Sequence, residues 1–453
     1  MLAAGVGSRM RSALPKVLHR VAGRTLLEAV LDAAAPLDAS RVVVVVGSDR
    51  DRIAAEVDGR GVHFAVQDPP RGTGDAVQRA REALGAGEGP ILVLAGDTPL
   101  LRSETLAGLV ARRHEKALDL AFLTFRPPDP GSFGRVVRDG RGRPTGIVEA
   151  RNASARQKRL GEVNAGAYCF AADALWRALD RVRRDPASGE FFLTDAVAIL
   201  AKQGGRVEAL EAGDWREAWG VNTRRDLADA EQIEQRRGVE RALDAGVTVL
   251  DPGTVRIGPR VVLGPDVVLH PFVSLEGKTV LAGGCEVLSF TRLLDTELAA
   301  GASIGPHCDA EGAKIGVNAH VGPYSRLRPG TELEDDVRVG NFVEIKNSVL
   351  HRGAKAQHLS YLGDAEVGAG ANIGAGVITC NYDGQKKHRT TVGEGAFVGT
   401  DSQLVAPVTI GRDAYVAAGT TVTGNVPDGA LAISRAPQVN KEGWAARRKA
   451  KKG

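Results

Sequence analysis

The sequence of 453 residues has few aromatic side chains, few cysteines and no long apolar run. Aromatic residues make up 4% of the chain, and no uncharged apolar stretch reaches the ~18 residues that a membrane-spanning helix requires. The cysteines lie far apart with no CxxC spacing, at Cys169, Cys285, Cys308 and Cys380. This spacing favours reduced thiols in a cytoplasmic protein over a disulfide framework. The N-terminal residues also lack the order of charged and apolar segments that is typical of a secretory signal.

Most of the chain also lacks an excess of charge of either sign. The net charge is +4, but residues 435–453 contain seven lysines and arginines against one glutamate, which leaves −2 for the rest of the chain. Aromatic and basic residues do not alternate, as they do in proteins that bind single-stranded nucleic acid. We therefore expect a short basic C-terminal tail over residues 435–453, no nucleic-acid partner and no membrane insertion.

Glycine, in contrast, is abundant, with 56 of the 453 residues against an average of about 7%. It does not recur at every third position, which excludes a collagen-like chain. The hydrophobic content of 43% is high enough to form cores, so general disorder is also excluded. Because glycine is densest after Val247, the second half is expected to be folded and repetitive.

Residues 1–222 have the pattern of an α/β domain. Residues 41–47 and 91–97 are short, β-branched apolar runs next to glycine, as in buried parallel strands. Residues 75–85, between these runs, have helical spacing and end in glycine. Residues 223–245 are polar and rich in Glu, Arg and Ala, which predicts a long helix that links two domains.

Residues 246–434 carry an aliphatic residue at every sixth position over three long stretches. These stretches run over residues 257–275, 315–345 and 392–422. The repeat predicts a β-solenoid in which each hexapeptide forms one side of a three-sided coil of about 18 residues. Hexapeptides of this type are typical of a left-handed parallel β-helix.

Two interruptions of the repeat predict loops that project from the solenoid. One lies near residues 276–297, and the other covers residues 380–391 with the sequence CNYDGQKKHRTT. Insertions into a solenoid gather on one face, which is often the binding face. We expect the second loop to take part in binding.

The segment LAAGVGSRM, at residues 2–10, predicts a phosphate-binding loop in the first domain. Its glycines let backbone N–H groups approach a phosphate closely. Arg9 and Lys16 can supply positive charge to a transferring phosphoryl group. Asp97 ends a strand-like run at the edge where open α/β sheets bind ligands, and its carboxylate suits magnesium.

The solenoid carries polar and aromatic residues that its repeat does not require. Five of them lie within 25 positions: His358, Tyr361, Asn372, Asn381 and Tyr382. Such side chains are costly to bury without partners, which favours a functional site. His358 can accept the proton of an attacking amine, and Arg328 and Lys346 can bind a sugar phosphate.

Seven motifs resemble one enzyme family in their order and approximate spacing: LAAGVGSRM, PKVLH, GTGDA, LAGDTPL, IVEA, VNAGAYCF and WGVNTR. The family is that of bifunctional N-acetylglucosamine-1-phosphate uridyltransferases and glucosamine-1-phosphate N-acetyltransferases. The resemblance covers nearly the whole chain. It implies an α/β Rossmann-like nucleotidyltransferase domain followed by a left-handed parallel β-helix.

The resemblance also implies two reactions on small-molecule substrates. Acetyl-CoA would acetylate glucosamine-1-phosphate without a metal, and UTP would then transfer uridylate to N-acetylglucosamine-1-phosphate with release of pyrophosphate. The product would supply the synthesis of peptidoglycan and lipopolysaccharide precursors. The family further implies a cytoplasmic homotrimer that assembles through the β-helix, with sites between subunits.

For uridyl transfer, the resemblance implies a set of residues that bind nucleotide and sugar: Leu2, Ala3, Ala4, Gly5, Lys16, Gln67, Gly72, Thr73, Gly134, Glu149, Asn164 and Asn222. Lys16 and Arg9 would be catalytic, and Asp97 and Asn222 would hold magnesium. Asp75 and Ala95 stand where the family commonly has a histidine and an aromatic residue.

For acetyl transfer, the resemblance implies that His358 is the general base. The matching glucosamine-1-phosphate positions are Arg328, Lys346, Tyr361 and Asn372. The matching acetyl-CoA positions are Ala375, Asn381, Tyr382, Thr400, Ala418 and Arg435. The basic tail either reaches a neighbouring subunit or only solubilises the protein.

Two other functions remain open at this stage. A sugar-nucleotide pyrophosphorylase with a regulatory β-helix would need no general base in the solenoid, so His358 argues against it. A trimeric scaffold that has lost catalysis would not need the reactive side chains Lys16, Asp97, Asn222 and His358. The bifunctional enzyme is therefore preferred.

Overall fold

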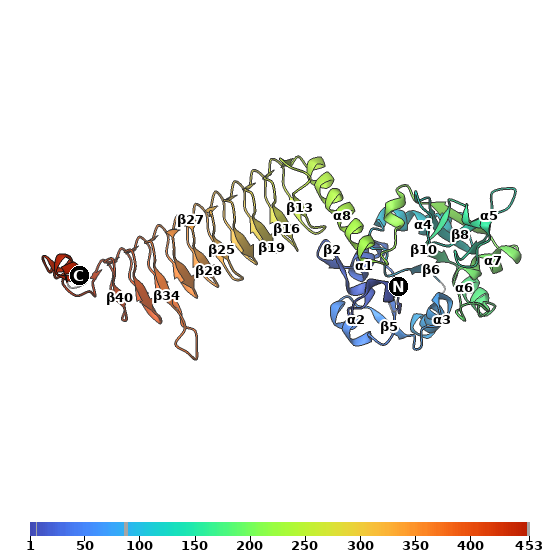
Figure 1. The fold of residues 1–453 in the computed structure, drawn as a ribbon, viewed down its shortest axis with the longest axis horizontal. Helices are drawn as coiled ribbons and strands as arrows, with labels where there is room; N and C mark the ends of the chain where they lie inside the picture. Colours follow the sequence, from blue (N-terminus) through green and yellow to red (C-terminus); the bar gives the residue numbers. More distant parts are fainter. Residues whose placement is uncertain (6, 86–88, 451–453) are drawn as a thin grey trace. The chain divides into compact units, whose positions relative to one another are not determined.

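The computed structural model describes residues 1–5, 7–85 and 89–450, and the chain forms two compact units (Figure 1). The first unit is Met1–Glu234 and the second is Gln235–Gly453. Val6 of the predicted phosphate-binding loop and residues 451–453 of the predicted basic tail lie outside the described residues. Within the described residues, no helix is both long enough and apolar enough to span a membrane.

The first unit is built around β-sheets whose strands come from distant parts of the sequence. Three parallel strands have the order β1-β4-β5: β1 (Leu2–Ala3), β4 (Val43–Val46) and β5 (His63–Val66). The second sheet has the order β11-β7-β10-β8-β9, with β6 (Ile91–Leu94) paired to β10. Its other strands are β7 (Leu120–Phe125), β8 (Arg135–Arg138), β9 (Pro144–Val148), β10 (Val163–Phe170) and β11 (Val207–Glu211). Leu2 bridges Ala95 in parallel, so β1 joins the two sheets.

Apolar runs and helix caps explain these elements. All four residues of β4 and all six of β7 are buried, as expected for strands covered on both faces. The α-helices of this unit are α1 (Leu26–Ala34), α2 (Arg50–Glu56), α3 (Thr73–Leu84), α4 (Ser103–Glu115), α5 (Ala155–Lys158), α6 (Ala172–Leu179) and α7 (Asp195–Lys202). Short 3-10 helices follow the N-terminal loop: η1 (Ser8–Met10), η2 (Lys16–Leu18), η3 (Ala35–Leu37) and, later in the chain, η4 (Trp215–Ala218).

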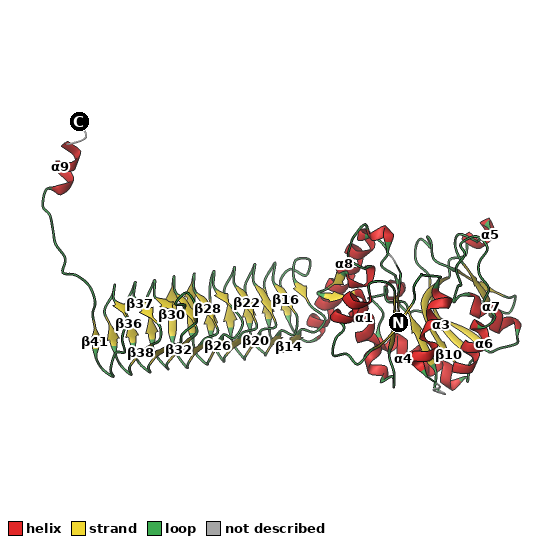
Figure 2. Cartoon of the chain, turned by 90° about the horizontal axis from the view of Figure 1, so that it is seen from below, coloured by secondary structure: helices red, strands yellow, loops and turns green. Residues whose placement is uncertain are grey.

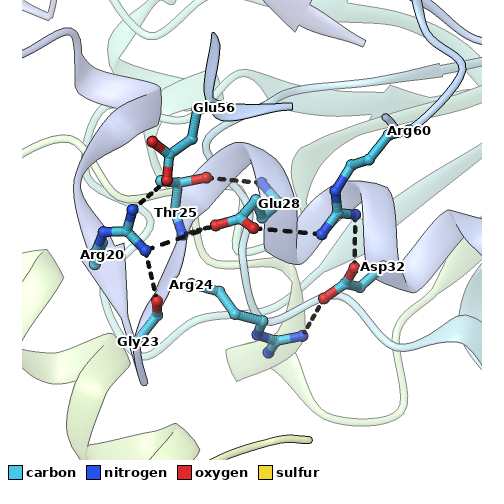
Figure 3. Close-up of polar contacts among 8 residues, drawn as sticks. All are labelled: Arg20, Gly23, Arg24, Thr25, Glu28, Asp32, Glu56 and Arg60. Atoms are coloured by element: carbon cyan, nitrogen blue, oxygen red, sulfur yellow. Dashed lines mark hydrogen bonds and ion pairs between the residues drawn. The ribbon is translucent and has the colours of Figure 1, made fainter. Parts of the chain in front are cut away.

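Charged side chains hold the hairpin of β2 (Arg20–Val21) and β3 (Arg24–Thr25) against helix α1 (Figure 3). Arg24, in β3, donates a hydrogen bond to Asp32 of α1 at 3.1 Å. Arg60 donates to the same carboxylate at 2.7 Å and to Glu28 at 3.3 Å. The Glu28 carboxylate also accepts the backbone N–H of the residue that caps α1, which completes a capping box. This network fixes the hairpin that follows Lys16 and η2.

Helix α8 (Arg224–Asp244) runs from the first unit into the second. Ala230, in its first half, belongs to an apolar cluster of the first unit, and Val239, in its second half, belongs to the core of the second unit. A side chain at Gly238 would clash with the backbone carbonyl of Ile257. Glycine at this helical position therefore allows the helix to pack closely on the first coil.

The second unit is a parallel β-helix with three flat faces (Figure 2). Face 1 runs from β12 (Thr248–Val249) to β41 (Leu431–Ala432), and face 2 from β13 (Arg256–Ile257) to β40 (Thr421–Val422). Face 3 runs from β14 (Val262–Leu263) to β38 (Val408–Ile410). The described residues give these faces eleven, ten and nine strands. The short helix α9 (Trp444–Ala450) follows the last coil.

The aliphatic residues of the six-residue repeat point into the β-helix. Leu275, Val339 and Leu404 are each fully buried, and all the predicted inward positions are buried except Leu263, which is partly buried against the same core. Burial of one such side chain on each side of each coil explains why the faces stack in register. The predicted fold class, an α/β domain followed by a left-handed β-helix, is confirmed.

The prediction of a projecting loop near residues 276–297 is wrong. Strand β16 (Ser274–Glu276) pairs with β19 (Arg292–Leu294), and β17 (Val280–Leu281) pairs with β20 (Glu297–Leu298), so the coils continue. The spacing of six continues through this segment with the buried residues Leu281, Val287 and Leu293, and it shifts only afterwards, because Leu298 follows Leu293 by five residues. Four such short sides all lie between faces 2 and 3, and each turns through a residue with positive φ: Asp295, Gly312, Asn347 and Asp364.

The second interruption is a real insertion, as predicted. Ala365 pairs with Thr390, twenty-five residues further on, whereas Thr390 pairs with Val408, eighteen residues further on. The extra residues form the loop between β34 (Ile378–Cys380) and β35 (Thr390–Val392), which projects from the coil in Figure 1. It leaves the β-helix at the corner between faces 2 and 3, called here the 2–3 corner.

Candidate active sites

The N-terminal loop packs directly on Lys16. Gly7 has φ 64°, and a Cβ there would lie only 2.6 Å from the Cβ of Lys16, so glycine is required by both backbone and space. A Cβ at Gly5 would meet nothing within 4 Å, which leaves open space next to the backbone at this point. The loop therefore closes tightly on one side and stays accessible on the other, as a phosphate-binding loop must.

Four predicted residues of the uridyl-transfer site lie together at the edge of the sheet. Lys16 begins η2, Asp97 follows β6, and Asn222 precedes α8. The ammonium of Lys16 forms an ion pair with Asp97 and donates to Asn222 Oδ1 at 3.2 Å. Arg9 donates to the same oxygen at 3.0 Å. Two cationic side chains thus converge with one carboxylate and one amide, although Asn222 is more than 200 residues from Arg9 and Lys16 in the sequence.

Asp97 and Asn222 fit the role of magnesium ligands. Both direct an oxygen at the ammonium of Lys16, which shows that this position attracts a positive charge. The described residues contain no group of three His, Cys, Asp or Glu side chains that could hold a metal ion. Two protein oxygens suit magnesium, which commonly takes its other ligands from water and substrate phosphates.

Three of the residues predicted to bind the nucleotide, Gln67, Gly72 and Thr73, lie between β5 and the start of α3. Gln67, which is buried, donates its amide to the carbonyl of Gly72 at 2.9 Å and to Asp75 at 2.7 Å. Gly72 has φ 100°, and a Cβ there would lie 2.5 Å from the carbonyl oxygen of Phe191. Thr73 accepts the backbone N–H of Leu193 through its hydroxyl. Asp75, which differs from the family's usual histidine, therefore orients the Gln67 amide.

The residues predicted to bind the sugar meet where β8, β9 and β10 come together. A Cβ at Gly134 would lie 3.8 Å from both Asn164 and Glu149, so these three residues surround one space. Burial raises the pKa of Glu149, and Thr194 donates to its carboxylate at 2.9 Å. Asn164 donates to the Tyr168 hydroxyl at 2.7 Å. Thr194 was not predicted, because its contact with Glu149 joins segments 45 residues apart.

In the β-helix, the acetyl-transfer residues stack along the corner between faces 1 and 2, called here the 1–2 corner. Asn341 pairs with His358 one coil further on. The same position in the next three coils is held by Ala375, Thr400 and Ala418. The carbonyl of His358 accepts a hydrogen bond from the N–H of Gly376, which follows Ala375, and the same pattern links each later pair of coils. A separation of 17 to 25 residues in the sequence therefore becomes one step between adjacent coils.

Asn341 orients the candidate general base. Its Oδ1 lies 2.9 Å from Nδ1 of His358, an exposed side chain. An amide oxygen accepts a hydrogen bond, so Nδ1 carries the proton and Nε2 keeps a free lone pair. Nε2 is then the atom that can accept a proton from an amine. Asn341 was not predicted, because only the stacking of one coil on the next brings it to His358.

The residues at the 1–2 corner are aromatic rings up to the coil before His358 and non-aromatic from the coil of His358 onwards. Before it, five rings stack along the corner with neighbouring centroids 4.7 to 5.3 Å apart: Phe272, Phe290, His307, Tyr324 and Phe342. In the coil of His358 the corner residue is Leu359, which is 62% exposed, and in the later coils it is Gly376, Asp401 and Gly419. The row of stacked rings therefore ends before His358, and Arg435 donates to the carbonyl of Ala418 at 2.7 Å further along the same corner.

Face 2 carries the cations predicted to bind a sugar phosphate. Arg328 pairs with Glu344 at 2.9 Å, and Lys346 lies in the next coil of the same face. The pKa of Lys346 is lowered, chiefly by the neighbouring ammonium of Lys387 and also by Arg328. Lys387 comes from the inserted loop and was not predicted. Like charges held this close favour binding of an anion such as phosphate.

Other predicted residues lie away from His358 within one chain. Asn372, in β33 (Asn372–Ile373), belongs to face 1 and not to face 2. Asn381 is buried at the 2–3 corner, where it donates to Asp364 at 2.5 Å. Tyr382 is 61% exposed in the inserted loop and donates to the carbonyl of Gly384. One chain therefore places the predicted acetyl-CoA residues at two different corners of the β-helix.

Two separate groups of polar residues, one in each unit, are typical of a transferase with two sites. The first unit combines the fold and the phosphate-binding loop of a nucleotidyltransferase. The second unit is a hexapeptide-repeat β-helix with an oriented histidine, as in an acyltransferase. The fold and sites together therefore define a two-domain transferase.

Comparison with known proteins identifies the family. A model of the MobA-like NTP transferase domain matches residues 1–246, and a model of the bacterial transferase hexapeptide, with six repeats, matches residues 389–424. A protein of Sorangium cellulosum named bifunctional protein GlmU is 47% identical, over 100% of this chain and 96% of its own length. Proteins of the same name from Anaeromyxobacter and Streptomyces coelicolor are 49% and 47% identical, each over 99% of this chain and over 92% and 94% of their own lengths. The chain belongs to the GlmU family of bifunctional transferases.

Proposed function

We propose that the chain makes UDP-N-acetylglucosamine in two steps, with acetyl transfer in the β-helix and uridyl transfer in the α/β domain. The observation that carries this proposal is the hydrogen bond from His358 to Asn341, which leaves the lone pair of Nε2 free to accept a proton. A pyrophosphorylase with a merely regulatory β-helix would not need a general base in this position. The second site, around Lys16 and Asp97, belongs to a different unit and different chemistry.

In acetyl transfer, His358 Nε2 accepts a proton from the amine of glucosamine-1-phosphate as the nitrogen attacks the acetyl carbonyl. The new C–N bond forms, the C–S bond of acetyl-CoA breaks, and the thiolate of CoA takes up a proton as it leaves. Arg328, Lys346 and Tyr361 bind the sugar phosphate, and Asn372 contributes from face 1. The 1–2 corner, through Ala375, Thr400, Ala418 and Arg435, holds acetyl-CoA. This step uses no metal.

In uridyl transfer, a phosphate oxygen of N-acetylglucosamine-1-phosphate attacks the α-phosphorus of UTP, and pyrophosphate leaves. Lys16 and Arg9 neutralise charge on the transferring group. Magnesium, when bound by Asp97 and Asn222, would neutralise further phosphate charge. The nucleotide is held by Leu2, Ala3, Ala4, Gly5, Gln67, Gly72 and Thr73, and the sugar by Gly134, Glu149 and Asn164.

The acetyl-transfer site is completed by a second copy of the chain in a homotrimer. Support comes from the separation of the predicted residues, because Asn381 and Tyr382 lie at the 2–3 corner and His358 at the 1–2 corner. Flat faces allow three β-helices to pack around a threefold axis, which would bring two different corners together. We also place the enzyme in the cytoplasm, consistent with its four free cysteines.

Two assays on the same protein test the proposal. CoA thiol release is measured with glucosamine-1-phosphate and acetyl-CoA, and pyrophosphate release with UTP and N-acetylglucosamine-1-phosphate. His358→Ala should lose thiol release by at least about 100-fold and keep pyrophosphate release. Asp97→Ala should do the opposite. If the wild-type protein releases pyrophosphate but no thiol, the bifunctional proposal is wrong and the single-activity alternative stands.

A further inference from the structure

Tyr361 and Gly363 lie on the same outer surface of one strand of face 2. They are the first and last residues of β31 (Tyr361–Gly363), and the residue between them, Leu362, points into the core. Gly363 pairs with Lys346 of the preceding coil. The backbone of Tyr361 therefore lies near the 1–2 corner. Gly363 stacks directly on Lys346, the lysine proposed to bind phosphate, and the two positions are called here the column of Lys346.

The ring of Tyr361 fills the space that a side chain at Gly363 would need. A Cβ at Gly363 would clash with the Tyr361 hydroxyl and would lie 2.7 Å from both Tyr361 Cζ and Asn381 Nδ2. The phenol thus lies along the strand, across Gly363, with its hydroxyl end towards Asn381. The backbone at Gly363 does not have a positive φ, so its conformation does not require glycine. Glycine is required instead by the packing of the Tyr361 ring and the Asn381 amide over this position.

We propose that Gly363 is a positioning residue for acetyl transfer, because its missing side chain lets Tyr361 place its hydroxyl in the column of Lys346. The inference rests on the proposed role of Tyr361 in binding glucosamine-1-phosphate. With alanine at this position, Cζ would have to withdraw from 2.7 Å to an ordinary contact of 3.4 Å or more. The hydroxyl, at the end of the ring, would leave its place beside the sugar phosphate.

Steady-state kinetics of the full chain test this inference. Gly363→Ala should raise KM for glucosamine-1-phosphate about tenfold, the effect of losing one hydrogen bond to a charged group. Pyrophosphate release should not change. Gly424→Ala is the matched control, because a Cβ at this exposed β-helix glycine meets nothing within 4 Å and its φ is not positive.

The Tyr361→Phe variant separates the inference from the function on which it rests. If Tyr361→Phe raises KM for glucosamine-1-phosphate, adding Gly363→Ala should raise it less than about twofold further, because the hydroxyl is already absent. If Tyr361→Phe raises KM while Gly363→Ala alone leaves it unchanged, only the inference is overturned. An equal penalty for Gly363→Ala in both backgrounds also overturns it. If Tyr361→Phe has the wild-type KM, the proposed role of Tyr361 fails as well.

Thermal unfolding covers the case in which Gly363→Ala folds poorly. Without the ring, an alanine at this position has space on one side, so Gly363→Ala should lower the unfolding temperature much less in a Tyr361→Ala background than in the wild type. The same loss in both backgrounds would show that another contact, and not the Tyr361 ring, requires glycine.

Discussion

Replacement of Asn341 by alanine would remove the side chain that orients His358. The two side chains share a single hydrogen bond of 2.9 Å between Asn341 Oδ1 and His358 Nδ1. A neutral hydrogen bond of this kind contributes about 1 kcal/mol, within a range of 0.5 to 1.5 kcal/mol. At 25 °C this corresponds to a loss of about fivefold, and at most about 13-fold, in kcat/KM for acetyl transfer.

The reason is the distribution of the proton between the two ring nitrogens. Without Asn341, the neutral imidazole can carry its proton on Nε2, and in that form it cannot accept one from the amine. The loss should therefore fall mainly on kcat and leave KM for both substrates within about twofold. Asn341→Asp should retain most of the activity, since its carboxylate accepts the same hydrogen bond.

Thiol release measures this effect, and pyrophosphate release by the same preparation shows that the first unit is intact. Gln357→Ala is a suitable control, because Gln357 is exposed on the same strand, next to His358. An Asn341→Ala enzyme with the wild-type kcat would refute the assignment of Asn341 as the residue that orients the base.

Two further predictions concern stability and assembly. The pKa of His351 is raised by Glu334 and Glu366, which contact its two ring nitrogens, and the pKa values of both glutamates are lowered. The wild type should therefore be more stable than His351→Gln between about pH 5 and 6.5. This difference should shrink as the pH rises towards 8, because the histidine loses its proton. Equal differences in unfolding temperature at pH 5.5 and pH 8 would contradict this prediction. For assembly, His358→Ala and Tyr382→Ala proteins, each inactive in thiol release, should regain activity when unfolded and refolded together, because a mixed trimer contains some sites with both residues intact. Failure of the mixture, with trimers present, would contradict a site shared between copies.

The periodic signals of the sequence were sufficient for the fold of the second unit. Burial of one aliphatic residue per side leaves a spacing of six that needs no tertiary information to detect. The predicted break near residues 276–297 was wrong, because the spacing of six continues there through Leu281, Val287 and Leu293 and shifts only at the five-residue side that follows, between Leu293 and Leu298. At this turn Asp295 takes a positive φ and absorbs the missing residue, so the coil continues although the sequence spacing is broken.

Local motifs were less informative about contacts between distant segments. The loop around Gly5 and the carboxylate of Asp97 could be predicted, because phosphate loops and strand ends are local features. Asn341, Lys387 and Gly363 could not, because each acts on a residue in another coil or across the strand surface. Only the stacking of coils brings Asn341 to His358, and only the inserted loop brings Lys387 to Lys346.

By itself, the sequence determined which chemical groups the protein carries and that it contains an α/β domain and a hexapeptide solenoid, since local spacing decides both. The tertiary structure decided which of these groups meet. It joined Arg9, Lys16, Asp97 and Asn222 at one edge of a sheet, and it separated His358 from Asn381 and Tyr382 by one face of the β-helix. The physical reason is that the corner to which each residue is assigned depends on the number of residues in every preceding side of the coil.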